Sequence, residues 1–351
     1  MKHLRNNIIR AGFDALYFSG AHHLLRPLFA GVGVILMLHH VRPARAGAFQ
    51  PNRHLEIAPD FLRAALAHVR DLGLDIVSLD EMHRRLTERD FSRRFVCFTF
   101  DDGYRDNRDF ALPIMRDYDA PFTVYATADF ADGGGRFWWL ALEQLVAGTT
   151  VIEAPIGRGV RIDAATPAAK QAAFDRLHGW LRGLADDQEM IKAVAALCVA
   201  HGIDADAPGR DLCMSWTELQ AFAADPLVTI GAHTLTHCAL AKASGATASH
   251  EMAASRTRIE DALQQPVHHI AYPYGDRLAA SAREFGLARA LGFRTGVTTR
   301  PGMLFPENAA HLTALPRVSL NGHYQDRRFL SVLTSGAATA MWNGFRRVDA
   351  A

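Results

Sequence analysis

Residues 95–103 read FVCFTFDDG, a largely apolar run that ends in two aspartates and a glycine. A short continuous run of this kind is typical of a strand that is buried on both faces. Two adjacent carboxylates at a buried strand end repel each other unless a cation or hydrogen bonds offset their charge. One of them can then bind metal while the other takes a proton. A DDG sequence is also a common turn, so this stretch alone does not define a site.

Strand and helix patterns alternate on both sides of this stretch, which indicates a parallel α/β architecture. The strands expected besides 95–100 are 33–38, 76–77, 121–126, 228–231 and 269–272, with short ones near Thr295 and Arg317. Residues 132–213 are mostly helical in pattern, and we interpret them as a helical insertion within one domain. We therefore predict an N-terminal amphipathic helical segment over 1–30, a main domain over 31–330 and a C-terminal tail over 331–351, weakly structured from Gly336.

The overall composition is that of an ordinary soluble globular protein, with 49% hydrophobic and 21% charged residues. A formal net charge of +1 provides no general attraction for nucleic acid, so no nucleic-acid partner is expected. None of the four cysteines forms a CxxC pair. We expect reduced thiols, as in the cytosol, with a Cys213–Cys238 disulfide as the alternative.

The N-terminal thirty residues have the spacing of an amphipathic helix. Polar residues such as Asn6, Asn7 and Asp14 interrupt the apolar stretch that an export signal needs, so we expect a cytoplasmic protein. A helix packed on the core is the simpler interpretation. A helix lying on a membrane surface is the alternative, and it would make the protein membrane-associated.

A pair of histidines, His233 and His237, follows the predicted strand at 228–231 in the sequence HTLTH. Two histidines at this spacing can bind one metal ion, and Thr234 is a candidate to hold the Nδ1 atom of a histidine ligand. Either histidine alone is more often a structural residue. Together with Asp102 the pair makes a three-ligand set with open positions, as catalytic divalent sites require. Asp101 remains as a second carboxylate that does not bind the metal. A three-ligand metal site with a free carboxylate beside it has the groups that metal-assisted hydrolysis needs.

A third cluster, AYPYG at 271–275, ends the strand predicted at 269–272. Such a turn presents aromatic rings and a backbone N–H group at a cleft. A plain structural turn explains the sequence equally well.

Taken together, TFDDG at 99–103, HTLTH at 233–237 and AYPYG at 271–275 resemble three motifs of the polysaccharide deacetylases, which are carbohydrate esterase family 4 with the NodB-homology domain. The similarity covers roughly residues 30–130 and 214–320, and the helical insertion lies outside it. The resemblance implies a distorted (β/α) barrel of the polysaccharide deacetylase type, here with a helical insertion.

The resemblance also implies roles for single residues. Asp101 would be the general base, and Asp102, His233 and His237 would hold the metal. Tyr274 would offer its backbone N–H to the oxyanion. Zinc suits this ligand set best, and cobalt or manganese would also fit.

Two residues of the family pattern are absent from their usual positions, so other residues would have to take their roles. The usual arginine of the third motif is Ala271 here, and Arg317 is a candidate to take its place; an ordinary surface or salt-bridging arginine is the alternative. The usual late strand that ends in a general-acid histidine is missing, but residues 35–39 (ILMLH) have that form, as in circularly permuted members of the family. We therefore expect His39 to be the general acid, with His40 as the competing candidate.

The activity implied is metal-dependent removal of N-acetyl groups from an amino sugar, in an oligosaccharide or polysaccharide or its lipid-linked precursor. A deformylase or O-acetyl esterase using the same site and a non-catalytic carbohydrate-binding relic are the alternatives. The expected partner is carbohydrate, with peripheral membrane contact through the N-terminal segment as an option. Trp138, Trp139 and His54 are candidates to line the sugar site; the tryptophans otherwise belong to the core of the insertion.

Overall fold

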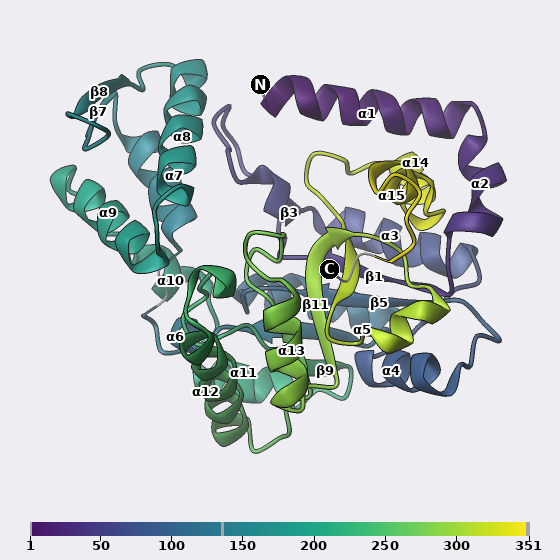
Figure 1. Ribbon diagram of the computed structural model, residues 1–351. Helices are drawn as coiled ribbons and strands as arrows, with labels where there is room; N and C mark the ends of the chain where they lie inside the picture. The colour runs from purple at the N-terminus through teal and green to yellow at the C-terminus, as the bar shows by residue number, and fades with distance from the viewer. Residues whose placement is uncertain (1, 135–136, 349–351) are drawn as a thin grey trace.

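A closed parallel barrel forms the centre of the computed structural model, which describes residues 2–134 and 137–348 (Figure 1). Residues 135–136 of the predicted insertion and 349–351 of the predicted tail lie outside the described residues. Within the described chain, seven parallel strands follow one another around the barrel in the order β1-β12-β11-β10-β9-β6-β5, and β1 also pairs with β5. The short strand β4 extends the sheet beyond β5. The (β/α) barrel predicted from the sequence is therefore confirmed.

The strands lie close to their predicted positions. The prediction rested on continuous apolar runs, which are typical of strands buried on both faces, and every residue of β1 and β5 is indeed buried. Their bounds are β1 Gly33–Leu38, β4 Asp75–Ile76, β5 Phe95–Phe100, β6 Phe122–Ala126, β9 Val228–Ala232, β10 His269–Ala271, β11 Thr295–Pro301 and β12 Leu315–Ser319. The register pairs Leu38 with Phe100, so β1 and β5 end at the same level of the barrel. The residues that follow them, His39 and Asp101, are thereby brought to one rim.

Helices cover the outside of the barrel, and several begin at a capping serine. Ser78, Ser215 and Ser244 each accept a hydrogen bond from the backbone N–H three residues later. The helices are α3 Pro59–Asp71, α4 Leu79–Glu88, a π-helical turn Asn107–Ala111 that continues into α5 Leu112–Asp117, α11 Trp216–Ala223, α12 Gly245–Leu263 and α13 Ala282–Ala290.

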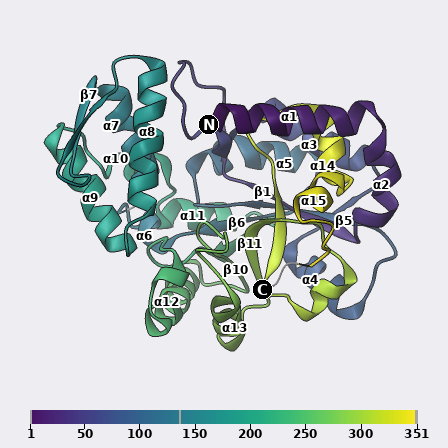
Figure 2. The same ribbon diagram turned by 45° about the horizontal axis from the view of Figure 1, so that its top comes forward.

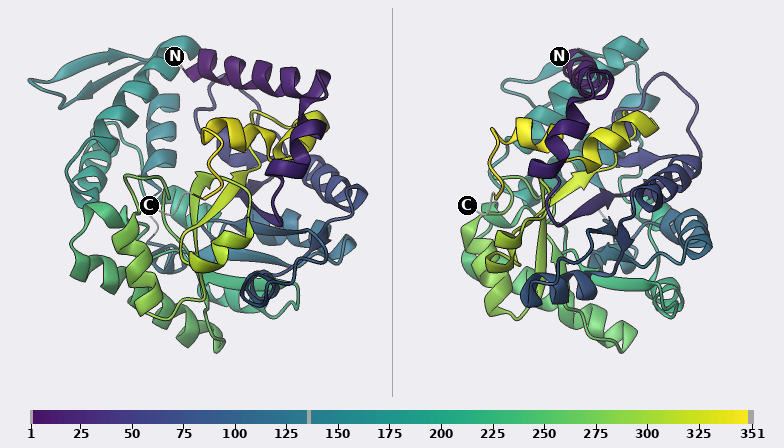
Figure 3. Two further views of the ribbon diagram at one scale, coloured as in Figure 1. Left: turned by 45° about the vertical axis from the view of Figure 1, so that its right-hand side comes forward. Right: turned by 90° about the vertical axis from the view of Figure 1, so that its right-hand side faces the viewer.

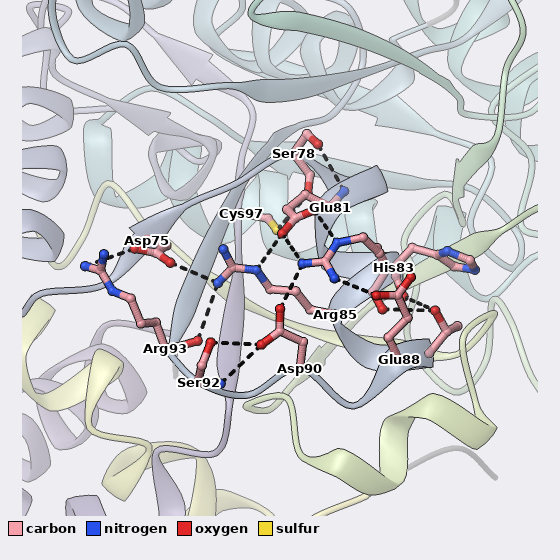
Figure 4. A network of polar contacts seen from close by, with 12 residues as sticks. Asp75, Ser78, Glu81, His83, Arg85, Glu88, Asp90, Ser92, Arg93 and Cys97 are labelled. Carbon is pink, nitrogen blue, oxygen red and sulfur yellow. Dashed lines mark hydrogen bonds and ion pairs between the residues drawn. The ribbon is translucent and has the colours of Figure 1, made fainter.

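Ion pairs connect α4 to β4 and to the residues before β5 (Figure 4). Arg85 contacts Glu81 at 2.8 Å and Asp75 at 3.0 Å, and Arg93 contacts Asp75 at 3.0 Å. Pairs near the surface contribute only about 0–1 kcal/mol each. None of these residues lines the candidate site described below, so we interpret the network as structural.

The insertion forms a lobe on one side of the barrel, drawn in teal in Figure 2, with an apolar core of its own. Its elements are α7 Trp138–Gly148, β7 Val151–Ala154, β8 Val160–Asp163, α8 Pro167–Arg182, α9 Asp187–Ala200 and α10 Ala207–Leu212, and the short helix α6 Ala128–Ala131 comes directly before it. The helical interpretation is correct for most of the segment, but it missed the antiparallel hairpin of β7 and β8. These strands have four residues each, too few for a clear alternation in the sequence.

The N-terminal and C-terminal helices pack against each other, as the views in Figure 3 show. Helix α1 (Lys2–Phe18) lies on α14 (Arg327–Thr334), and α2 (Ala21–Phe29) lies on α15 (Ala337–Trp342). The ring of Phe13 is 5.3 Å from the ring of Phe329. The prediction of a weakly structured stretch from Gly336 is wrong for α15, since two of its alanines and Thr339 are buried in this packing. None of the helices in the described residues is long and apolar enough to cross a membrane.

Candidate active site

An ion pair between Asp101, which follows β5, and Arg317, in the middle of β12, lies inside the barrel. The guanidinium donates two hydrogen bonds of 2.7 Å to the two carboxylate oxygens, and Nε donates to the Thr298 carbonyl at 2.8 Å. Arg317 is 1% exposed, so it is not an ordinary surface arginine. Burial alone would raise the pKa of Asp101, but the charge and hydrogen bonds of Arg317, together with the nearby His233 and His39, lower it overall. Asp101 is therefore held as a carboxylate.

Asp102, the next residue, turns toward the two histidines of the HTLTH segment. The distance from its Oδ1 atom to Nε2 is 3.5 Å for His233 and 3.3 Å for His237. The Nδ1 atom of His233 donates to the Ala271 carbonyl at 2.8 Å, which leaves the lone pair of Nε2 on the side of Asp102. Thr234 has a different task from the one predicted, because its hydroxyl accepts the backbone N–H of His237 at 3.0 Å.

The chemistry of these donors fits a divalent metal. One ligand atom from each of Asp102, His233 and His237 lies within 4.8 Å of the others, and all three side chains are buried. Ligand atoms about 2.0–2.2 Å from a tetrahedral zinc ion lie roughly 3.3–3.6 Å apart, close to the two spacings given above. Burial lowers the pKa of His233 to about 4, so this imidazole is neutral and able to coordinate. The same residues were predicted from the sequence as ligands.

The two histidines after β1 face different surroundings. The Nε2 atom of His39 is 3.9 Å from Oδ2 of Asp101, and His39 lines the same cavity. His40 instead pairs through Nδ1 with Asp106 at 2.6 Å and stacks on Tyr104 with ring centres 3.6 Å apart. Burial lowers the pKa of His39 even though Asp101 and Asp102 attract a proton to it. Of the two, His39 is the one that lies in the cavity beside Asp101, while His40 is turned to Asp106.

The third motif turns sharply at Tyr274, whose φ of 61° is in the left-handed region. Thr299 stabilises the turn by donating from Oγ1 to the Tyr274 carbonyl at 2.6 Å. Within residues 2–134 and 137–348, the N–H of Tyr274 donates to no other residue. Asp102, Thr234 and His237 also have positive φ, at 75°, 61° and 60°. Such conformations are costly for residues other than glycine, and they gather here around one centre.

A cavity of about 340 Å³ lies over these groups, and the insertion supplies part of its wall. Trp138 donates from Nε1 to the Tyr274 hydroxyl at 2.9 Å, and the Arg182 guanidinium lies 4.1 Å from the centre of the Tyr274 ring. The tryptophans were expected either to line the site or to belong to the insertion core, and they do both. The lining residues are Met37, His39, Asn52, His54, Leu55, Asp101, Asp102, Trp138, Trp139, His178, Arg182, His233, His237, Tyr274, Asp276 and Thr299.

Several of these lining residues were not predicted from the sequence. One further group that was not predicted does not line the cavity. Arg182 and His178 come from α8, for which the motifs give no signal. Asn52, in the loop before α3, donates from Nδ2 to Glu143 at 2.8 Å and so joins that loop to the insertion. The Ala271 carbonyl that holds His233 is a backbone group, and no residue type encodes it.

Comparison with known proteins shows the family of the chain. Residues 88–163 and 185–296 match the family model described as polysaccharide deacetylase, and the two segments together make up more than half of the chain. The chain belongs to the polysaccharide deacetylase family. The deacetylase assignment predicted from the three motifs is therefore confirmed, and the protein is a hydrolase. No curated protein sequence matches this deacetylase.

Solved structures share the fold of this deacetylase. The Streptococcus pyogenes deacetylase PplD, in complex with acetate, has a TM-score of 0.55 and 19% identity over 82% of this chain and 92% of that chain. The polysaccharide deacetylase BC0361 from Bacillus cereus has a TM-score of 0.54 and 15% identity over 86% and 68%. IcaB from Ammonifex degensii has a TM-score of 0.51 and 16% identity over 82% and 91%. At these identities the likeness shows the fold alone.

The donor set leads to a prediction on metal binding. We expect the purified deacetylase to bind one zinc ion per chain and His237→Ala to bind it at least tenfold more weakly, because a buried ligand is lost. Isothermal titration with zinc measures this, with the exposed His250→Ala as the matched control. Equal affinity in the wild type and both variants would contradict the site.

Proposed function

We propose that this deacetylase removes N-acetyl groups from an amino sugar, in an oligosaccharide or polysaccharide or its lipid-linked precursor, and that it depends on a divalent metal, most suitably zinc. The observation that carries the proposal is the pair of adjacent buried carboxylates with separate partners. Asp101 is held by Arg317, while Asp102 is directed to two imidazoles. The proposed metal ligands are Asp102, His233 and His237, and a bound metal would polarise the acetyl carbonyl and a water molecule.

The proposed reaction uses four further groups of the chain. Asp101 accepts a proton from the water molecule, whose oxygen forms a bond to the carbonyl carbon. Arg317 keeps Asp101 ionised and oriented for this step. The N–H of Tyr274 donates a hydrogen bond to the developing oxyanion. His39 protonates the nitrogen as the C–N bond breaks, because an amide nitrogen leaves poorly without a proton. The products are acetate and a free amino sugar.

The acyl group and the glycan need a direct assay, because a deformylase or an O-acetyl esterase would use the same residues. We expect zinc-loaded enzyme to release acetate from at least one substrate in a panel of N-acetylated oligosaccharides, nucleotide sugars and lipid-linked glycans. Asp101→Asn is expected to lower the rate by roughly 10²- to 10⁴-fold, the usual contribution of a general base. Formate release from N-formyl sugars in place of acetate would move the proposal to the deformylase. If the metal-loaded protein acts on none of these substrates, the non-catalytic carbohydrate-binding relic becomes the preferred interpretation.

The two histidines after β1 give a matched pair of variants. His39→Ala is expected to lower kcat by roughly 10²-fold or more, because His39 lines the cavity beside Asp101. His40→Ala removes the contact with Asp106 and is expected to affect thermal stability more than kcat. Steady-state rates and melting temperatures of both variants distinguish the two residues. A larger loss of kcat in His40→Ala would reverse the assignment.

We also propose that the deacetylase works at the surface of an anionic membrane, on its cytoplasmic side. Residues of α2 and the C-terminal region expose large apolar side chains, namely Leu24, Leu28, Met341, Trp342 and Phe345, each at least 55% exposed. The two segments that carry them lie together, since α2 packs on α15, Arg347 donates to the Leu28 carbonyl and Phe345 lies 5.6 Å from Phe29. Residues 15–55 and 327–348 contain no aspartate or glutamate. Apolar side chains among arginines are the combination that binds anionic lipid.

Liposome binding tests this surface. We expect Leu24→Ser/Leu28→Ser to weaken sedimentation with vesicles that contain phosphatidylserine, because both side chains are exposed and their loss removes buried area only in the bound state. Val199→Ser is the matched control, since Val199 is 76% exposed on the insertion. No binding by the wild type, or equal binding by all three proteins, would refute the membrane contact.

A further inference from the structure

A second cavity, of about 360 Å³, adjoins the candidate active site. Asp276 and Thr299 line both cavities, so the two are neighbours across these residues. Thr299 also donates to the carbonyl of Tyr274, which belongs to the third motif. The volume of the second cavity is within the range of about 300–1,000 Å³ that small-molecule sites have. A glycan whose reacting sugar lies over Asp101 can therefore continue into this second space.

The side chain of Trp342, the last residue of α15, forms part of the wall of this cavity. Trp342 is 62% exposed, whereas Trp138 and Trp139 of the insertion are at most 7% exposed. Most of its large aromatic surface is therefore accessible to a ligand. The faces of an indole ring are apolar, and a pyranose ring also has an apolar face of C–H groups, so the two can stack.

Trp342 is carried by an element that the rest of the fold holds in place. Helix α15 packs on α2 and α14. The residue that follows Trp342, Asn343, donates from Nδ2 to the Pro301 carbonyl at 2.6 Å, which connects the end of α15 to β11. A tryptophan has only two side-chain torsions, so on a fixed backbone it loses little conformational freedom when it binds a ligand.

The polar side chains of the second cavity are held by other groups of the protein. Arg277 and Arg300 both have partners within the chain. Asp276 accepts the backbone N–H of Leu278 at 2.9 Å and lies 3.7 Å from Arg182. A neutral ligand requires no spare charge, and carboxylate, amide and guanidinium groups can each form more than one hydrogen bond. The hydroxyl groups of a sugar are suitable partners for such groups.

We propose that the second cavity is a glycan subsite in which a sugar next to the reacting one stacks on Trp342, so that the substrate is an oligosaccharide or a longer glycan and not a single amino sugar. The inference rests on the proposed deacetylation and deepens it by assigning a second binding site. Trp342 lies outside the two segments that match the family model. None of the groups assigned to bond cleavage lines this cavity, so its loss should affect glycan binding and not the chemical step.

The experiment compares kcat/KM for acetate release from the tetramer of N-acetylglucosamine and from its monomer. We expect the wild type to prefer the tetramer. Trp342→Ala should lower kcat/KM for the tetramer by roughly 3- to 10-fold, mainly through KM, because one stacked ring is lost. The value for the monomer should stay unchanged. Equal tetramer-to-monomer ratios in the wild type and Trp342→Ala would overturn the subsite.

Two further variants separate stacking from a change in the fold. Phe345→Ala is the matched control, since Phe345 is 58% exposed in the same segment but does not line the cavity, and it should leave the ratio unchanged. Trp342→Phe retains an aromatic ring and should restore much of the preference for the tetramer. Because Trp342 is exposed, the melting temperature of Trp342→Ala should stay close to that of the wild type. An equal loss of the ratio in Phe345→Ala would assign the effect to packing of the segment and refute the stacking.

A binding measurement separates this proposal from the deacetylation itself. Asp101→Asn lacks the proposed base, so isothermal titration of this variant with the tetramer follows binding without turnover. Adding Trp342→Ala to it should weaken the affinity by the same roughly 3- to 10-fold. If it does so while the wild type releases no acetate, the subsite is supported and the proposed activity fails. If acetate is released and the affinity does not change, the activity stands and the subsite fails.

Trp342 is also one of the exposed apolar side chains proposed above to contact lipid. The comparison of tetramer and monomer contains no lipid, so a lost preference for the tetramer supports the subsite whether or not the variant also binds vesicles less. Sedimentation of Trp342→Ala with phosphatidylserine vesicles completes the test. Weaker sedimentation together with an unchanged tetramer-to-monomer ratio would assign the ring to the membrane contact alone and overturn the subsite.

Discussion

The buried pair of Asp101 and Arg317 is the interaction on which the site depends. A charged carboxylate inside a barrel is unstable unless an opposite charge and hydrogen bonds replace the water it has lost. Arg317 supplies both from the last strand of the barrel, and it is itself held by the Thr298 carbonyl of the neighbouring strand. Because the guanidinium offsets the charge of Asp101, Asp102 can carry a second negative charge directly beside it, and its carboxylate is directed toward the two imidazoles.

Closure of the barrel gives this arrangement its unusual order along the chain. Strand β1 pairs with β5 and β12, so the first strand lies between the strands that carry Asp101 and Arg317. His39 thus reaches the aspartate from the N-terminal part of the chain. A ring of strands has no intrinsic start, and a group can be supplied from either end of the sequence without changing the geometry at the rim.

Much of the barrel and its chemistry could be predicted because the signals are local. Apolar strands that end in DDG, HTLTH and AYPYG mark the rim, and the strand at 33–38 was placed at its observed bounds. The contact of Arg317 with Asp101 was harder to predict, since 216 residues separate them and only spatial proximity relates them. The hairpin of β7 and β8, helix α15 and the wall residues of α8 were missed. Short elements have weak periodicity, and their stability comes from packing that local sequence does not record.

Part of the cavity wall, formed by Trp138, Trp139, His178 and Arg182, comes from a segment that interrupts the barrel. The insertion has a separate apolar core, and it meets the third motif through a few contacts such as Trp138 with Tyr274. The groups proposed for bond cleavage all come from the barrel and its rim. The part of the cavity wall that the insertion supplies and the groups proposed for bond cleavage are therefore encoded in different stretches of the gene, so the insertion can change in sequence while those groups stay the same.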